Sequence, residues 1–385
     1  MKIVYALNWF LDYRLPVFEH LKTLTVNNFY VLYNKDNVPE RVHLKMKNLL
    51  GDKAIAFSNE KILTIGNRKK SGDFANKFFE IRYQPGLYSK IKELNPDVLI
   101  GEGFFRWGLV NLTYKAFNKV KYLMLYERTP HTERNVSKIV QFVRKLTFPL
   151  IDGINCNGKL CKDYILSLDY NHSKISERHM VADTLSISAN SQIYDSKQRE
   201  EFKNSLDLKG KVYLYCGQMV KRKGVKELID AWVQFNTINN EEKTLLMIGS
   251  GEEEEYVKSK SKIISNIKYL DKVDFDVIYK YFCVADVFVI LTLEDNGSIV
   301  LPEAMAAGLP VITSKFNGNH PEYINKKNGW VVNPINSNEV IKVFNEVFTS
   351  DLVSMGKESL KIMKDFTPEI AAKNIYNAAT QSLKN

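Results

Sequence analysis

The segment LTLEDNGSIVLPEAMAAGLPVIT, Leu291 to Thr313, places two carboxylates, Asp295 and Glu303, on either side of a glycine–serine pair. The run VFVILT (287–292) that leads into it is apolar and β-branched, which predicts a buried strand. The stretch GSIVLPEAMAAG (297–308) predicts a short helix with Ser298 as its N-cap and Gly308 just past its end. The segment is therefore expected to be a strand, a loop and a helix in succession.

The start of this predicted helix has the chemistry of a sugar-nucleotide site. Free backbone N–H groups at a helix start favour an anion, and four residues would supply them: Gly297, Ser298, Ile299 and Val300. Glu303 would lie one turn further in and accept hydrogen bonds from a ribose, while Asp295 would accept hydroxyls of a sugar. A site that binds phosphate between two hydroxyl-rich groups, a ribose and a sugar, fits a nucleotide-diphosphate sugar.

A second segment, YCGQMVKRKGVKELIDAW (215–232), predicts a strand, a cationic loop and an amphipathic helix. The loop holds Lys221, Arg222 and Lys223, and Gly224 opens the helix. Three cations at a helix N-terminus are opposed by the helix dipole, which favours anions there. We therefore expect them to neutralise a diphosphate, lysine as a point charge and arginine as a fork.

Short β-branched runs alternate with amphipathic stretches along the whole chain, the pattern of βα units in parallel sheets. One series of expected strands is 2–7, 29–33, 97–103, 121–127 and 153–157, with helices such as 15–24 and 106–117 between them. A second series is 211–217, 244–251, 267–270, 287–292 and 310–314. The two series predict an α/β protein with two Rossmann-like, doubly wound domains.

The predicted domains are residues 1–185 and 186–366. The polar stretch 183–202 is expected to contain the linker. The last segment, 367–385, predicts a helix with Thr367 as N-cap and Pro368 at its first position, packing back near the N-terminal domain. Open parallel sheets bind ligands at the carboxyl ends of their strands, so a cleft between the domains is the expected site.

Composition narrows the class of protein. The four cysteines show no metal-ligand or CxxC spacing, so we expect buried thiols in a reducing compartment and no bound metal. The first 18 residues are interrupted by polar side chains and lack the apolar core of a signal peptide. The longest apolar run, 283–293, is too short to span a bilayer and contains Asp286. A soluble, cytoplasmic protein is expected.

The positive charge is concentrated in the N-terminal half. Residues 1–185 hold 29 Lys and Arg against 18 Asp and Glu, or +11, whereas residues 186–385 hold 25 against 26, or −1. The excess includes NRKK (67–70) beside FANKFFEIRY (74–83). This combination suits peripheral contact with an anionic inner membrane face or an acidic acceptor; a solvated loop followed by a core helix is the alternative. No nucleic-acid motif accompanies the charge, and nucleic acid is not an expected partner.

Four segments resemble one known family. These are GQMVKRKGVKELIDAW (217–232), LLMIGSGEEEEYV (245–257), IKYLDKVDFDVIYKYFCVADVFVILT (267–292) and EDNGSIVLPEAMAAGLPVITSKFNGNHPEYI (294–324). In order and spacing they resemble the nucleotide-binding domain of retaining GT-B glycosyltransferases, the "glycosyl transferases group 1" family (glycosyltransferase family 4-like). The resemblance is strong over 211–335 and holds only in outline for the N-terminal half. The family signature of two acids separated by seven residues is met by Asp295 and Glu303; Asp295 replaces the usual glutamate, and Glu294 is the alternative.

The resemblance implies a GT-B fold, in which two Rossmann-like domains face each other across a cleft. It also implies that Asp295 and the amides after it hold the donor sugar, Glu303 the ribose and Lys223 the diphosphate. Val273, in the loop after Leu270, would contact the base. The remaining expected donor contacts are Gly217, Gln218 and Gly249. Because Gln218 stands where the family commonly has arginine, Arg222 is expected to supply that charge.

The N-terminal half offers two candidates for contact with the reacting sugar. Glu127 ends the predicted strand 121–127, and His131 follows four residues later. A histidine after such a strand is usual in the family, yet the position at the strand end favours Glu127. A structural role for either residue is the alternative.

These features predict a retaining glycosyltransferase that needs no metal. It would move a sugar from a nucleotide-diphosphate sugar, a UDP-sugar being favoured, to a hydroxyl of a glycan or lipid-linked acceptor in surface polysaccharide biosynthesis. The expected catalytic residues are Lys223, Arg222, Asp295, Glu127 and His131. The alternatives are a GT-B nucleotide-sugar epimerase and a sugar-binding module without catalysis. A Rossmann-type oxidoreductase is disfavoured, because no G-x-G-x-x-G follows the first strand.

Overall fold

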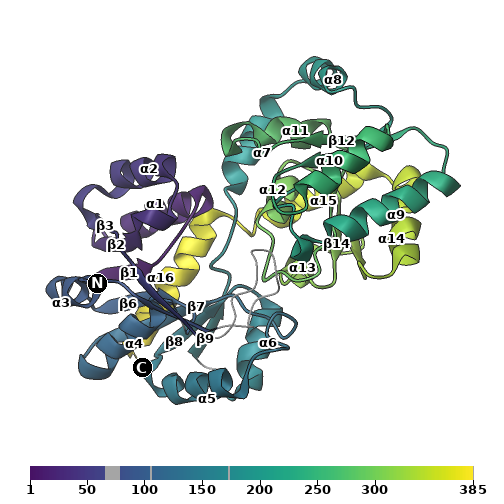
Figure 1. The fold of residues 1–385 in the computed structure, drawn as a ribbon. Coiled ribbons are helices and arrows are strands. Elements are labelled where there is room, and N and C mark those ends of the chain that lie inside the picture. The colour runs from purple at the N-terminus through teal and green to yellow at the C-terminus, as the bar shows by residue number, and fades with distance from the viewer. Residues whose placement is uncertain (66–78, 105, 172–173, 385) are drawn as a thin grey trace. The chain divides into compact units, whose positions relative to one another are not determined.

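The structure is a computed structural model that describes residues 1–65, 79–104, 106–171 and 174–384. The predicted basic segment 67–70, and 74–78 of the aromatic segment beside it, lie outside the described residues. The chain forms two compact units (Figure 1). The described part of unit 1 runs up to Val181 and resumes at Pro368, while unit 2 contains Ala182–Thr367. The division thus falls between residues 181 and 182, close to the predicted boundary between 185 and 186.

Unit 1 is built on a seven-stranded parallel sheet in the order β3-β2-β1-β6-β7-β8-β9. Its strands are β1 (Ile3–Leu7), β2 (Phe29–Asn34), β3 (Ala54–Phe57), β6 (Val98–Glu102), β7 (Lys121–Tyr126), β8 (Gly153–Cys156) and β9 (Ile175–Glu177). Its α-helices are α1 (Leu15–Leu24), α2 (Glu40–Leu50), α3 (Leu87–Leu94), α4 (Gly108–Phe117), α5 (Lys138–Thr147), α6 (Lys159–Ser167) and α16 (Pro368–Lys384). A separate antiparallel hairpin joins β4 (Lys61–Ile65) and β5 (Phe79–Tyr83).

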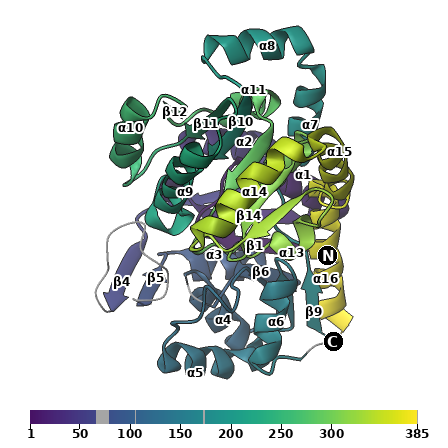
Figure 2. The same ribbon diagram turned by 90° about the vertical axis from the view of Figure 1, so that its right-hand side faces the viewer.

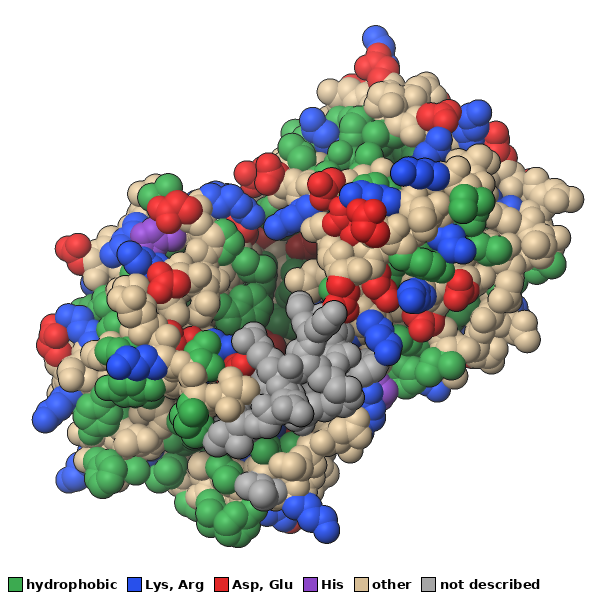
Figure 3. Space-filling model, in the orientation of Figure 1, with side chains coloured by type: hydrophobic (Ala, Val, Ile, Leu, Met, Phe, Trp, Pro, Cys, Tyr) green, Lys and Arg blue, Asp and Glu red, His purple; other side chains and the backbone are tan. Residues whose placement is uncertain are grey.

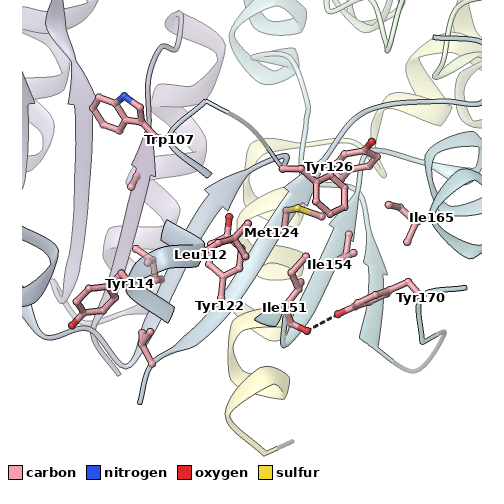
Figure 4. Packing of buried hydrophobic residues seen from close by; sticks show 14 of the residues in the cluster. Trp107, Leu112, Tyr114, Tyr122, Met124, Tyr126, Ile151, Ile154, Ile165 and Tyr170 are labelled. Atoms are coloured by element: carbon pink, nitrogen blue, oxygen red, sulfur yellow. Dashed lines mark hydrogen bonds between the residues drawn. The ribbon is translucent and has the colours of Figure 1, made fainter. Parts of the chain in front are cut away.

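The core of unit 1 lies where β7 and β8 meet the helices (Figure 4). Alternate residues of β7, Tyr122, Met124 and Tyr126, point to the same face of the sheet and are buried there. The one hydrogen bond drawn in this view runs from the Tyr170 hydroxyl to the carbonyl of Ile151, at 2.8 Å. This hydrogen bond offsets the free-energy cost of burying the hydroxyl away from water.

The C-terminal helix α16 belongs to unit 1 and packs against α1, as both ribbon views show (Figures 1 and 2). It begins at Pro368, as predicted; proline is well placed there because the first helical N–H has no partner within the helix. Its buried face carries Ala371, Ala372, Ile375 and Ala379, whose 3.6-residue spacing fits one helical stripe. The small alanine side chains allow a close approach to the neighbouring elements.

Unit 2 is built on a six-stranded parallel sheet in the order β12-β11-β10-β13-β14-β15. Its strands are β10 (Lys211–Cys216), β11 (Lys243–Ile248), β12 (Ile267–Leu270), β13 (Val287–Ile290), β14 (Val311–Ser314) and β15 (Gly329–Val332). Its α-helices are α7 (Thr184–Ile193), α8 (Ser196–Ser205), α9 (Val225–Ile238), α10 (Glu254–Ile263), α11 (Ile278–Val284), α12 (Val300–Ala306), α13 (His320–Tyr323), α14 (Ser337–Thr349) and α15 (Leu352–Met363).

The aromatic core of unit 2 fixes the helix that follows the cationic loop. Trp232 of α9 stacks edge-on against Tyr213 of β10 at 5.0 Å between ring centroids, and both rings meet Phe344 of α14. The Tyr213 hydroxyl donates to the carbonyl of Phe344 at 2.6 Å. Because α9 is held along its buried face, its N-terminus has a fixed position over the end of β10.

The structure confirms the predicted fold class and corrects several elements. The stretch 183–202 is not a linker but forms α7 and most of α8, both in unit 2. Its polar composition reflects helix caps: the Asp183 carboxylate accepts from the Ser186 amide at 3.3 Å, and Asp195 forms a capping box with Gln198. The sequence did not predict strands β3, β9 and β15 or the hairpin. The second strand of the hairpin, β5, stands in the segment 74–83, for which a core helix was the alternative. No helix in the described residues is both long and apolar enough to cross a bilayer.

Candidate functional site

Two loops meet at the switch point of the sheet in unit 2. From β10 the chain passes outward to β11 and β12, and then returns to the other side of β10 as β13. The connection after β10 leads toward one edge of the sheet and the connection after β13 leads toward the other edge. Open parallel sheets bind ligands in the crevice at such a point, where the strand order reverses. The cationic loop, a 3-10 turn over Lys221–Lys223, follows β10, and the acid-bearing loop follows β13. The two segments that the sequence marks as donor-binding therefore lie side by side in unit 2.

Backbone contacts hold the two loops together. The carbonyl of Arg222 accepts three hydrogen bonds from the acid-bearing loop: from the amides of Leu293 at 2.8 Å and Glu294 at 3.1 Å, and from the hydroxyl of Thr292 at 2.9 Å. Gly224 makes this approach possible. Its φ is +67°, and a Cβ there would lie 1.9 Å from the carbonyl oxygen of Leu291. Any side chain at this position would push the loops apart.

At the centre of the site, the Lys223 ammonium forms an ion pair with the Asp295 carboxylate. The side chains are 12% and 9% exposed, so the pair is largely desolvated. The Ser298 hydroxyl donates to the same carboxylate oxygen at 2.6 Å and lies 3.5 Å from the ammonium nitrogen. Burial by itself raises the pKa of Asp295, but the charges of Lys223 and Arg222 outweigh it and hold the pKa below its usual value. Asp295 is thus an anion poised beside a cation.

The turn before α12 differs from the prediction. The helix begins at Val300, so Ser298 is not its N-cap; its hydroxyl is used by Asp295 instead. Two of the four predicted free amides are also engaged, since the Gly297 amide donates to Asp295 at 3.2 Å and the Ser298 amide to Asn317 at 3.2 Å. Asn317, which no sequence pattern indicated, therefore occupies part of the expected anion site. A ligand phosphate that uses these amides must displace the side chains of Asp295 and Asn317.

Ile299 and Val300, the other two predicted amide donors, lie at the junction of this turn and α12. The Ile299 carbonyl accepts from the amide of Glu303 at 3.4 Å. Glu294, the alternative first acid, is buried, with 4% of its surface exposed. Of the two adjacent acids, Asp295 is the one paired with Lys223.

Glu303 is buried in α12, with 8% of its surface exposed. Burial raises the pKa of its carboxyl to about 8, and the negative charge of Asp183 adds to the shift. This carboxyl is therefore protonated near neutral pH. It can then donate a hydrogen bond as well as accept one, so a ribose diol remains a suitable partner.

This raised pKa predicts a stability difference. The unfolded carboxyl ionises above its ordinary pKa of 4.5, whereas the folded one stays protonated up to about 8, so the wild type loses stability across that interval as pH rises. Glu303→Gln is expected to be about 2–4 kcal/mol more stable than the wild type near pH 9 and about equal to it near pH 5. Urea unfolding at both pH values measures this. Glu255→Gln, at an exposed position, is the control, and a pH-independent difference between Glu303→Gln and the wild type contradicts the prediction.

The other predicted donor residues lie at the same edge of the sheet. Gln218 accepts a hydrogen bond from the Arg222 guanidinium at 3.0 Å, which places the expected substitute charge directly beside it. Gly249 directly follows β11 and has φ +146°, and a Cβ there would lie 1.9 Å from the carbonyl oxygen of Gly217. The two glycines thus allow close approach of the loops after β10 and β11. Val273, half-buried, is in the loop after β12.

In unit 1, Glu127 belongs to a buried charged cluster at the carboxyl ends of the strands. The guanidinium of Arg14 lies 3.0 Å from the Glu102 carboxylate and 3.4 Å from that of Glu127. The Tyr5 hydroxyl donates to Glu102 at 2.7 Å. Burial raises the pKa of Glu127, but the nearby His179 and Arg14 more than compensate and hold the pKa at about 2. Glu127 is therefore ionised at any physiological pH.

His179, which no sequence pattern indicated, faces this carboxylate. Its Nδ1 lies 3.1 Å from the Asn155 side-chain oxygen, and the Asn155 amide donates to Ser176 at 2.9 Å. The other ring nitrogen, Nε2, lies 3.9 Å from the Glu127 carboxylate. Burial lowers the pKa of His179, and the carboxylate of Glu127 acts against this shift.

His131 lies on the turn that follows Glu127. Its carbonyl accepts from the Arg134 amide at 3.5 Å and from the Arg134 guanidinium. The contacts described above place Glu127, together with Arg14 and His179, in the buried cluster. Which of the two residues contacts the reacting sugar stays a prediction.

Comparison with known proteins shows what the chain is similar to. Residues 196–364 match the family model described as "Glycosyl transferases group 1". This range contains both loops of the unit 2 site. Over these residues the chain is similar to the glycosyl transferases group 1 family. The chain is 27% identical over 203 residues to an uncharacterized glycosyltransferase of Methanocaldococcus jannaschii, covering 52% of this chain and 50% of that one. It is 23% identical over 261 residues to an uncharacterized 41.2 kDa protein in the cps region of Klebsiella pneumoniae, covering 66% and 68%.

The chain thus spans about half the length of the first of these curated relatives. Solved structures resemble it over nearly the whole chain. A glycosyltransferase from Rickettsia africae has a TM-score of 0.74 at 13% identity, covering 100% of this chain and 99% of that one. HepE from Anabaena, solved in complex with UDP, has a TM-score of 0.73 at 14% identity, covering 99% and 100%. At such identities the likeness establishes the GT-B fold, as the sequence predicted.

Proposed function

We propose that this protein is a retaining, metal-independent glycosyltransferase that moves a sugar from a UDP-sugar to a hydroxyl of a glycan or lipid-linked acceptor in surface polysaccharide biosynthesis. The observation that carries the proposal is the desolvated Lys223–Asp295 pair at the switch point of the unit 2 sheet. The match of residues 196–364 to the glycosyl transferases group 1 model supports the reaction class. The HepE structures with UDP and with UDP-glucose support the choice of donor, and the cps-region relative supports the choice of pathway.

In this proposal the bound donor replaces Asp295 as the partner of Lys223 and Gln218 as the partner of Arg222. The diphosphate oxygens engage Lys223 and Arg222, which frees Asp295 to accept hydroxyls of the sugar. The ribose binds at Glu303, and the base lies near Val273. Preorganised charge of this kind stabilises a leaving diphosphate without solvent reorganisation, and it is the role that a metal ion has in other transferases.

The proposed step breaks the bond between the anomeric carbon and the diphosphate oxygen. The acceptor hydroxyl oxygen forms the new bond to that carbon on the same face, so configuration is retained. Its proton passes to the departing diphosphate, which balances the reaction. The ionised Glu127 carboxylate, oriented by Arg14 and His179, is proposed to contact the reacting sugar from unit 1.

A donor screen tests this function. A UDP-sugar is expected to raise the melting temperature above that seen with GDP- and ADP-sugars, since a ligand at about 100 times its Kd adds about 2.7 kcal/mol to folding stability. The donor that stabilises most is then incubated with and without candidate glycan or lipid-linked acceptors, and released UDP and sugar products are measured. Acceptor-dependent release of UDP with retained configuration is expected. An epimerised or free sugar formed from the donor alone contradicts the proposal and favours an epimerase; binding without any turnover favours a sugar-binding module.

A further inference from the structure

Helix α5 of unit 1 presents an outward face with two large apolar side chains. Phe142 and Leu146 are 61% and 62% exposed, and they stand four residues apart, so they share one face of the helix. Lys138 and Lys145 fall on the same face by helical spacing. The helix contains no acidic residue. This outer face, made of Lys138, Phe142, Lys145 and Leu146, is the pattern of a basic amphipathic helix.

The inner side of α5 is firmly held, so the exposure of the outer face is not the result of a loose helix. Ser137 caps the N-terminus by accepting from the Val140 amide at 3.3 Å. Arg144, 4% exposed, pairs with Glu133 and donates to the Tyr164 hydroxyl at 2.9 Å. Its guanidinium also lies over the Phe104 ring, 5.5 Å from the centroid. The outer face therefore has a fixed orientation and cannot turn inward without breaking this network.

The surroundings of α5 are also apolar and basic. Phe117, at the end of α4, is 79% exposed and lies between Lys115 and Lys119 in the sequence. The 3-10 turn Phe148–Leu150 after α5 packs on α4, and Figure 3 shows hydrophobic side chains at the end of unit 1 that carries these helices. Lys145 forms an exposed ion pair with Asp169 at 3.6 Å, a contact of small energy in water.

We propose that the outer face of α5 docks this protein on an anionic bilayer surface. Phe142 and Leu146 would enter the boundary between headgroups and acyl chains, while Lys138 and Lys145 would contact the anionic headgroups. Charge complementarity selects this occupant, because both charged residues of the face are lysines and residues 1–185 hold a net charge of +11. The acidic neighbour Asp169 contacts the face only through its weak, exposed pair with Lys145. The inference deepens the proposed function, since it names the surface on which a lipid-linked acceptor would be met.

Binding of the full chain to vesicles tests the inference without any donor or acceptor. A failed donor screen would therefore not contradict the membrane proposal, and a failed vesicle experiment would not contradict the proposed transferase activity. Vesicles of phosphatidylcholine alone and with phosphatidylglycerol are compared by flotation. Binding is expected only to the anionic vesicles and is expected to weaken as salt is added. The double variant Phe142→Ser/Leu146→Ser should lower the partition coefficient about tenfold or more, and Lys138→Gln/Lys145→Gln about fivefold for each lysine.

Matched controls come from α10 of unit 2, where Ile263 is 79% exposed and Lys262 is also exposed. Ile263→Ser and Lys262→Gln should leave partitioning unchanged, and all variants should melt at the wild-type temperature because each changes an exposed residue. Equal binding by the α5 variants and the wild type would overturn the proposal, as would equal binding to neutral vesicles. A dimer in sedimentation that Phe142→Ser/Leu146→Ser abolishes, with no vesicle binding, would assign the face to a second copy instead.

Discussion

Lys223→Ala is expected to lower kcat/KM for glycosyl transfer by about 10²- to 10³-fold, the usual effect of removing one preorganised group that stabilises developing charge. The proposed role of Lys223 is to meet the diphosphate as it departs. Neighbouring Arg222 is held by Gln218 at 3.0 Å and is not expected to replace the ammonium. Steady-state kinetics with the donor identified by the screen measure the effect. Lys221→Ala, at an exposed position of the same turn, is the matched control and should change kcat/KM little.

The same substitution has a second expected effect, because Lys223 also neutralises Asp295. Removing one partner of a largely buried ion pair leaves an unpaired charge and typically costs about 3–5 kcal/mol of folding stability. Lys223→Ala/Asp295→Asn removes both charges and should recover most of that stability, while activity stays low. If the double variant regains activity together with stability, Lys223 acts only through folding and the proposed role in catalysis is wrong. Unchanged kcat/KM in Lys223→Ala leads to the same conclusion.

Most of the fold follows from local patterns in the sequence. The buried central strands are continuous apolar runs, such as VFVI in β13, and these can be recognised without tertiary information. The strands that were missed lie mainly at sheet edges or are short: β9 has three residues, ISE, and β15 contains an exposed valine. Pairing with a neighbour makes such segments into strands, and their own composition does not. The two helices α7 and α8 were missed because their cap residues look like loop composition.

The candidate site was predictable where residues of a single loop define it. Lys223 and Asp295 each stand directly after a recognisable strand, and the order of strands brings the two loops together. Asn317 was not selected because its role depends on a contact with Ser298 across 19 residues of sequence. The cluster around Glu127 is less local still: Arg14 and Glu102 are 88 residues apart. A single arginine gives no local sequence signal that it will be buried beside carboxylates distant in the sequence.

That burial makes Arg14 the position where the second large effect is expected. Arg14→Met is predicted to reduce the free energy of unfolding by about 3–5 kcal/mol near neutral pH, because it leaves the Glu102 carboxylate unpaired in a largely desolvated site. The side chain of Glu127 is about a third exposed, so water screens its share and Glu102 supplies most of the loss. Against a total stability of about 5–15 kcal/mol for a typical folded protein, this is a severe change. Urea unfolding at neutral pH measures it.

The pH dependence separates this electrostatic effect from lost packing. In the wild type the pKa of Glu127 is about 2, below its ordinary value of 4.5, so its contribution to stability is present above the unfolded pKa and is lost as pH falls through the folded one. Without Arg14 the Glu127 carboxylate protonates more readily, and the stability difference between Arg14→Met and the wild type should shrink as pH falls below about 4. Arg41→Met, which breaks an exposed pair with Asp12 at 2.6 Å, should cost less than about 1 kcal/mol at every pH. A loss for Arg14→Met that stays constant with pH would assign the effect to packing of the arginine stem and remove the electrostatic role of the cluster.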